Sequence, residues 1–174
     1  MDAFEQLIAT LFRRMGYWIR ADFRVELDRG NRPQIDLLAY RPKENLLRIC
    51  ECKSWMESAG VTFRHFERPD AKDDRLWLFN DDRRRENVLA HLTQQLVDAD
   101  LCLPDPKIKL CLACGHIANE TDRAKISSHF ESKGWILFDE NQICDELAKA
   151  AGKRKYEDDL AVIVAKLLIK SNRH

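Results

Sequence analysis

Two neighbouring strand-like segments constrain the fold of this 174-residue chain more than any other feature of its sequence. The segments are Gln34–Arg41 and Leu46–Lys53, and both are mostly apolar. Between them lies Pro42–Asn45, whose composition is typical of a turn. The sequence therefore predicts two antiparallel strands that are joined by a short turn.

Each segment carries a carboxylate among its apolar residues. A turn centred between Lys43 and Glu44 places Asp36 directly opposite Glu51, with their Cβ atoms roughly 5 Å apart. Two carboxylates at that distance repel each other unless a cation or a shared proton lies between them. Lys53 points to the same face as Glu51, because side chains alternate along a strand. The pattern predicts a divalent metal at the two carboxylates, with Lys53 as a further positive charge.

The N-terminal part of the chain predicts a helix followed by a strand. Apolar residues recur at helical spacing from Ala3 to Met15, and Gly16 ends the helix. Residues 17–27 then alternate between apolar and polar side chains, which is the pattern of a half-buried strand. Within the two segments described above, Leu47, Ile49 and Glu51 are expected on one face, and Cys50 and Cys52 on the other.

The later part of the chain predicts an alternation of helices and strands within a single α/β domain, residues 1–174. The strand–helix–strand unit that it contains implies parallel pairing. The elements expected are a long connection over 54–82 with a short strand at Leu76–Phe79, a helix over 84–97, a strand over 107–114, a helix that Thr121 caps and that reaches Lys133, a strand over 135–138, and helices over 140–151 and 157–169.

The spaced acids, the lysine and the order of elements together resemble the PD-(D/E)xK phosphodiesterase superfamily, which has the restriction-endonuclease-like fold. The resemblance implies an αβββαβ core with a mixed central sheet and additional C-terminal helices. It also implies that Asp36 and Glu51 bind Mg²⁺ or Mn²⁺ together with the backbone carbonyl of Cys52, and that Lys53 is the catalytic lysine. Ile35 stands where the family name has proline.

Many members of that superfamily add a glutamate on the first helix, and Glu5 is placed to match it as a fourth catalytic residue. Glu5 also has a structural alternative. The spacing from Asp2 to Glu5 is that of a capping box, in which Glu5 only closes the first turn of its own helix.

The function implied by the resemblance is that of a metal-dependent nuclease, which hydrolyses phosphodiester bonds of nucleic acid, with DNA favoured. Arg20 and Arg24, on the polar face of the first strand, and Arg84 are candidate contacts to the phosphates. A homodimer is compatible with this interpretation. The alternative is a module of the same fold that binds nucleic acid or protein and has lost catalysis.

A redox or zinc protein is a further alternative, based on Cys111, Cys114 and His116. On a strand, however, residues 111 and 114 face opposite sides, so they cannot share a metal without a bend. Free cysteines are commonly buried as small apolar residues, and this is the interpretation that we favour for both.

The composition of the chain excludes few classes of function. The chain has 29 basic and 29 acidic residues, so net charge neither supports nor excludes nucleic-acid binding. With 45% hydrophobic and 33% charged residues, the composition is typical of a globular protein. The sequence has no apolar run long enough to span a membrane and no pattern of a signal peptide. A cytoplasmic location with reduced cysteines is therefore expected.

Overall fold

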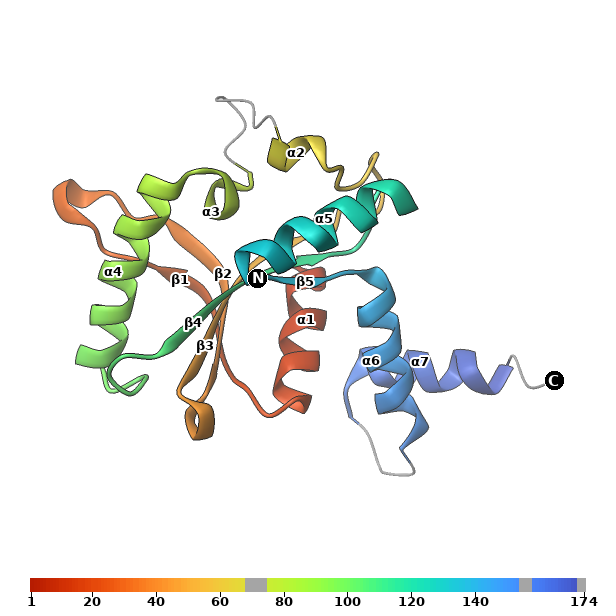
Figure 1. The fold of residues 1–174 in the computed structure, drawn as a ribbon. Helices are drawn as coiled ribbons and strands as arrows, with labels where there is room; N and C mark the ends of the chain where they lie inside the picture. The colour runs from red at the N-terminus through yellow and green to blue at the C-terminus, as the bar shows by residue number, and fades with distance from the viewer. Residues whose placement is uncertain (68–74, 154–157, 172–174) are drawn as a thin grey trace.

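The computed structural model describes residues 1–67, 75–153 and 158–171 of the chain (Figure 1). Its centre is an open five-stranded sheet with strand order β1-β2-β3-β4-β5. Pairing is antiparallel from β1 to β3 and parallel from β3 to β5, so the sheet is mixed and the α/β class is confirmed. The strands are β1 Trp18–Arg24, β2 Gln34–Arg41, β3 Leu46–Lys53, β4 Lys107–Cys114 and β5 Ile136–Phe138.

The helices follow the predicted order, with two short additions in the connection after β3. None of the helices in the described ranges is both long enough and apolar enough to cross a bilayer. They are α1 Ala3–Arg14, the short α2 Arg64–Glu67 and α3 Trp77–Asn80, then α4 Asp82–Asp98, α5 Glu120–Lys133, α6 Glu140–Gly152 and α7 Leu160–Ser171, with 3₁₀ turns at Asp28–Gly30 and Pro42–Glu44.

The strand predicted at Leu76–Phe79 was wrong, because these residues enter helix α3. Trp77, Leu78 and Phe79 are all buried there. A short apolar run fits a buried strand and a buried helical turn equally well, so periodicity alone could not separate them.

Several boundaries also differ from the prediction, among them the following three. Strand β1 ends at Arg24, and the chain beyond it closes a turn in which the Val25 N–H donates to the Pro33 carbonyl. Helix α5 is capped by Asn119 rather than Thr121, since the Asn119 side chain accepts a hydrogen bond from the Asp122 N–H. The helix expected from residue 157 begins at Leu160, and residue 157 itself lies outside the described residues.

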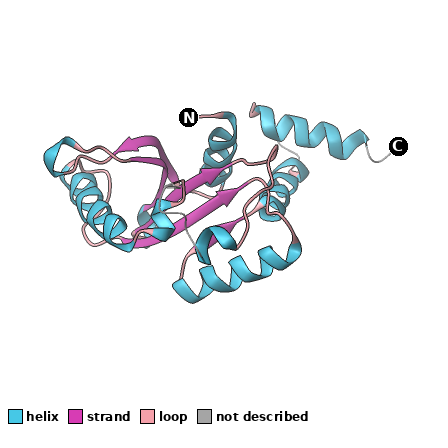
Figure 2. Cartoon of the chain, turned by 90° about the horizontal axis from the view of Figure 1, so that it is seen from above, coloured by secondary structure: helices cyan, strands magenta, loops and turns pink. Residues whose placement is uncertain are grey.

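Helices lie on both sides of the sheet (Figure 2), and apolar side chains cover both of its faces. On one face, Leu47 and Ile49 pack with buried residues of α4 and α5. On the other face, Cys50 and Cys52 pack with buried residues of α1 and α6. The predicted alternation along β3 is therefore confirmed, and the sheet lies between two helical layers.

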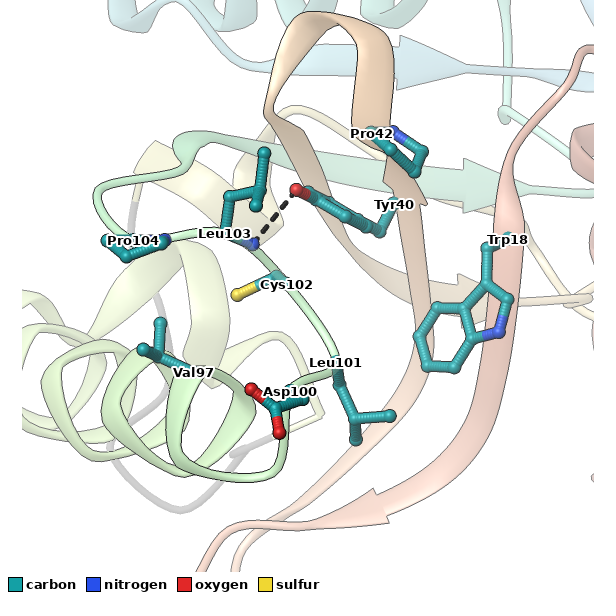
Figure 3. A pocket seen from close by; sticks show the side chains of 9 residues that line it. All are labelled: Trp18, Tyr40, Pro42, Val97, Asp100, Leu101, Cys102, Leu103 and Pro104. Carbon is teal, nitrogen blue, oxygen red and sulfur yellow. Dashed lines mark hydrogen bonds between the residues drawn. The ribbon is translucent and has the colours of Figure 1, made fainter.

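Tyr40 ties the β2–β3 turn to the loop before β4. Its hydroxyl donates to Asn45 Oδ1 at 2.9 Å and accepts from the Leu103 N–H at 3.0 Å. The loop and the turn line an open, mostly apolar pocket of about 490 Å³, with Trp18 on its opposite side (Figure 3). The two hydrogen bonds fix the end of the sheet that lies farthest from Asp36 and Glu51.

Replacement of Tyr40 by Phe is expected to lower the free energy of unfolding by about 1–3 kcal/mol, because the hydrogen bonds of its hydroxyl to Asn45 and from the Leu103 N–H are both lost. Tyr17→Phe is the matched control. Both tyrosines are 4% exposed, but the Tyr17 hydroxyl makes no hydrogen bond of normal geometry with the described residues. Tyr17→Phe should therefore change stability by less than about 0.5 kcal/mol in urea unfolding. Equal losses for the two variants would contradict the role of the Tyr40 hydroxyl.

Candidate active site

The β2–β3 register brings the predicted acids to the same end of the sheet. The ladder pairs Leu37 with Cys50 and continues to the pair Arg41–Leu46, which is the register that the turn predicts. The next step of this register would be Asp36 and Glu51, but the ladder ends before them. The two acids therefore lie where β2 and β3 separate, so their side chains do not form a regular cross-strand pair.

Asp36 replaces the missing ladder bond with its side chain. Its Oδ2 accepts a hydrogen bond of 2.8 Å from the Cys52 N–H. The same oxygen lies 3.9 Å from Lys53 Nζ. Asp36 is thus held against the backbone between Glu51 and Lys53, and its side chain is 16% exposed.

Glu51 is the more buried of the two acids, with a side chain that is 7% exposed. Its Oε1 accepts a hydrogen bond of 2.5 Å from Lys53 Nζ. Burial raises the pKa of Glu51 to about 7, and the charge of Asp36 adds to this rise while Lys53 opposes it. The carboxyl is therefore close to its midpoint of ionisation at neutral pH.

Lys53 is the positive charge that the two carboxylates share. Burial disfavours its charged form, yet the carboxylates of Glu51 and Asp36 outweigh burial and raise the pKa of Lys53. The ammonium group consequently stays protonated at neutral pH. One lysine cannot neutralise two ionised carboxylates, so the cluster keeps a negative charge when both are ionised.

Glu5 forms the capping box that its spacing indicates. The Glu5 N–H donates to Asp2 Oδ1 at 2.8 Å, and the Asp2 N–H donates to Glu5 Oε2 at 2.9 Å. The charge of Asp36 nevertheless contributes to the rise in the pKa of Glu5, after burial and the charge of Asp2. Glu5 therefore caps α1 and also lies close enough to Asp36 to interact with it electrostatically.

The three candidate arginines occupy different places. Arg84, in the first turn of α4, lies over the Trp77 ring at 4.5 Å from the centroid, and its charge helps to lower the pKa of Glu51. Arg20 and Arg24 lie on the exposed side of the edge strand β1. The structure thus brings Arg84 towards the carboxylates. The sequence did not connect Trp77 with Arg84, because the segment of Trp77 was interpreted as a strand.

The cysteines of the zinc alternative lie on opposite faces of β4. Cys111 packs with the α1 layer and Cys114 with the α4–α5 layer, and both are fully buried. Burial raises the pKa of Cys114, which favours the neutral thiol over a metal-binding thiolate. Within the described ranges, no three His, Cys, Asp or Glu side chains form a group that could hold a metal ion.

Comparisons of this chain with protein-family models, with curated proteins and with solved structures gave no significant match.

A pH titration of stability should reveal the buried carboxyl of Glu51 in the metal-free protein. Its pKa is 4.5 in the unfolded chain and about 7 in the folded one. The folded state therefore keeps a proton that the unfolded state releases between these values, and stability falls as pH rises through this window. Glu51→Gln has no such proton to release and should lack this loss.

The measurement is urea unfolding of wild type and Glu51→Gln with EDTA at about pH 5 and about pH 8. The variant should gain stability relative to wild type as pH rises. Using the difference between the two proteins removes the contribution of Glu5, whose pKa is also raised. A difference that does not change with pH would show that Glu51 does not titrate in this range.

Proposed function

We propose that this protein is a Mg²⁺-dependent nuclease in which Asp36, Glu51 and Lys53 form the catalytic centre. The observation that carries the proposal is the convergence of two carboxylates and a lysine at the end of the β2–β3 ladder, with Lys53 Nζ 2.5 Å from Glu51 and 3.9 Å from Asp36. A buried carboxyl such as Glu51, whose pKa is raised by burial and influenced by nearby charges, is typical of functional sites.

The order of the elements supports the same proposal. Helix α1, strands β1 to β3, helix α4 and strand β4 follow the αβββαβ order of the restriction-endonuclease-like fold. The acids lie on β2 and β3, and the lysine lies two residues after the second acid, as in the PD-(D/E)xK pattern. We therefore extend the proposal to this fold and superfamily.

The donor set fits Mg²⁺ or Mn²⁺. Both ions prefer oxygen ligands, and Mg²⁺ is commonly held by only one or two carboxylates while it keeps several waters. Asp36 and Glu51 would hold the ion, together with the carbonyl of Cys52 between Glu51 and Lys53. When bound, the ion would polarise a phosphoryl oxygen and lower the pKa of the attacking water.

The side chains around the carboxylates have distinct roles in this proposal. Lys53 stays protonated and stabilises negative charge that develops on the phosphate. The hydrogen bond from the Cys52 N–H orients Asp36. Glu5, which is held by its capping box, adds negative charge near Asp36 and helps to orient water.

Nucleic acid, with DNA favoured, is the proposed substrate. Arg84 interacts with Glu51 through space, so it is placed to contact a phosphate that enters the site. Arg20 and Arg24 are exposed on the edge strand and would contact the backbone farther from the reacting bond. The same arginines would serve an inactive nucleic-acid-binding module, and only an assay for cleavage separates these two functions.

The test is an assay of purified protein on supercoiled plasmid, single-stranded DNA and single-stranded RNA with Mg²⁺ or Mn²⁺. Lys53→Met keeps the length of the side chain and removes its charge. It should lower the cleavage rate at least about 100-fold while substrate binding changes little, because the charge acts mainly on the transition state.

Lys109→Ala is the matched control. Lys109 lies on the neighbouring strand β4, opposite Arg48 of β3, and its Nζ donates to the Gly134 carbonyl at 3.0 Å. This variant should cleave like wild type. Full activity of a folded Lys53→Met protein would remove Lys53 from the catalytic centre. Binding of nucleic acid by wild type without cleavage would favour the inactive module.

A further inference from the structure

Helix α7 is apolar on two opposite sides. Apart from Lys166, Lys170 and Ser171, all of its residues are apolar. Val162 is fully buried where α7 packs on α6, and Asp159 fixes the start of the helix by accepting a hydrogen bond from the Thr10 hydroxyl. Figures 1 and 2 both show α7 at the edge of the molecule, away from the sheet. One side of α7 therefore packs against the rest of the protein.

The other side of α7 forms an exposed apolar stripe. Leu160 is 75% exposed, Val164 45%, Leu167 62% and Leu168 60%. Their spacing puts all four on one face of the helix, and this spacing is the one that lets two helices pack along a seam. Apolar stripes of this kind on a protein surface commonly mark interaction sites.

The charges of α7 favour a particular partner. Asp158 precedes the helix, whereas Lys170 lies in its last turn. An antiparallel copy of the same helix brings the acidic start of each next to the basic end of the other. A parallel copy would instead place like charges together.

The stripe is also self-complementary. A two-fold axis at Val164 sets Leu160 of one chain against Leu168 of the other, and it brings the end of one helix that carries Asp158 level with the end of the other that carries Lys170. Two-fold symmetry repeats each of these contacts, as in most homodimers. We infer that α7 is a dimerisation helix that pairs with α7 of a second copy of this chain in antiparallel orientation. This inference does not depend on the proposed nuclease activity.

The helix pair alone predicts a weak dimer. A helix of 12 residues is about 18 Å long, so the contact is smaller than a standard interface. We expect a Kd on the order of micromolar. Sedimentation velocity of the full chain from about 1 to about 200 μM should therefore show a concentration-dependent change from monomer to dimer.

Leu168→Glu tests the apolar stripe. It should raise the Kd on the order of 100-fold or more, because the charge enters the interface twice. Thermal melting should change little, since the side chain is exposed. Leu103→Glu, at a leucine that is 54% exposed outside α7, is the matched control and should leave the Kd unchanged. The inference would be overturned if the wild type stayed monomeric over this range, or if Leu103→Glu raised the Kd as much as Leu168→Glu.

A charge exchange tests the antiparallel orientation and the choice of partner. Asp158→Lys and Lys170→Asp should each weaken the dimer, and the double variant should restore it. The same charges also favour the helix itself through its dipole, but that effect predicts that the double variant is the worst of the three. Failure of the double variant to recover would overturn the antiparallel pairing. Binding of monomers to vesicles with anionic phospholipids, without dimer formation, would assign the stripe to a membrane surface instead.

Discussion

The buried ion pair between Glu51 and Lys53 is the interaction on which the carboxylate end of the sheet depends. Glu51 follows Leu47 and Ile49 on a face that otherwise packs against helices. Removing one partner of such a pair typically costs roughly 3–5 kcal/mol, whereas replacing both with apolar residues is often neutral or stabilising. Stability alone therefore gives no reason for this pair. Its position beside Asp36 supports the metal site proposed above.

The two ends of the β2–β3 hairpin contrast in how their polar groups are satisfied. At the turn, the Tyr40 hydroxyl bonds Asn45 and the Leu103 N–H, and the Asn45 amide donates to the Pro104 carbonyl. At the other end, the ladder stops and two carboxylates meet a single lysine. The turn fixes the register, and the register determines which polar side chains meet at the end that carries the carboxylates.

Much of this arrangement could be predicted from the sequence, because strands and turns impose simple rules. The turn at residues 42–45 fixed the register, and alternation along β3 separated Glu51 from Cys50 and Cys52. The capping-box spacing identified the contacts between Asp2 and Glu5. Each of these predictions depends on residues that are close in the sequence or joined by a short turn.

Other features depend on tertiary contacts and were not predictable in this way. Trp77 belongs to a helix rather than a strand, because its side chain packs in the core together with distant parts of the chain. The hydrogen bond from the Cys52 N–H to Asp36 exists only because the ladder ends early. The approach of Arg84 to Glu51 follows from the position of α4 over the sheet, which no local pattern specifies.

Binding of Mn²⁺ tests most directly the proposal that Asp36 and Glu51 hold one divalent cation. Free Mn²⁺ has a strong paramagnetic resonance signal that decreases when the ion binds protein. The account predicts that wild type binds one Mn²⁺, that Asp36→Asn loses this binding, and that Glu44→Gln, at the exposed turn of the same hairpin, keeps it. Unchanged Mn²⁺ binding by a folded Asp36→Asn protein would contradict the account.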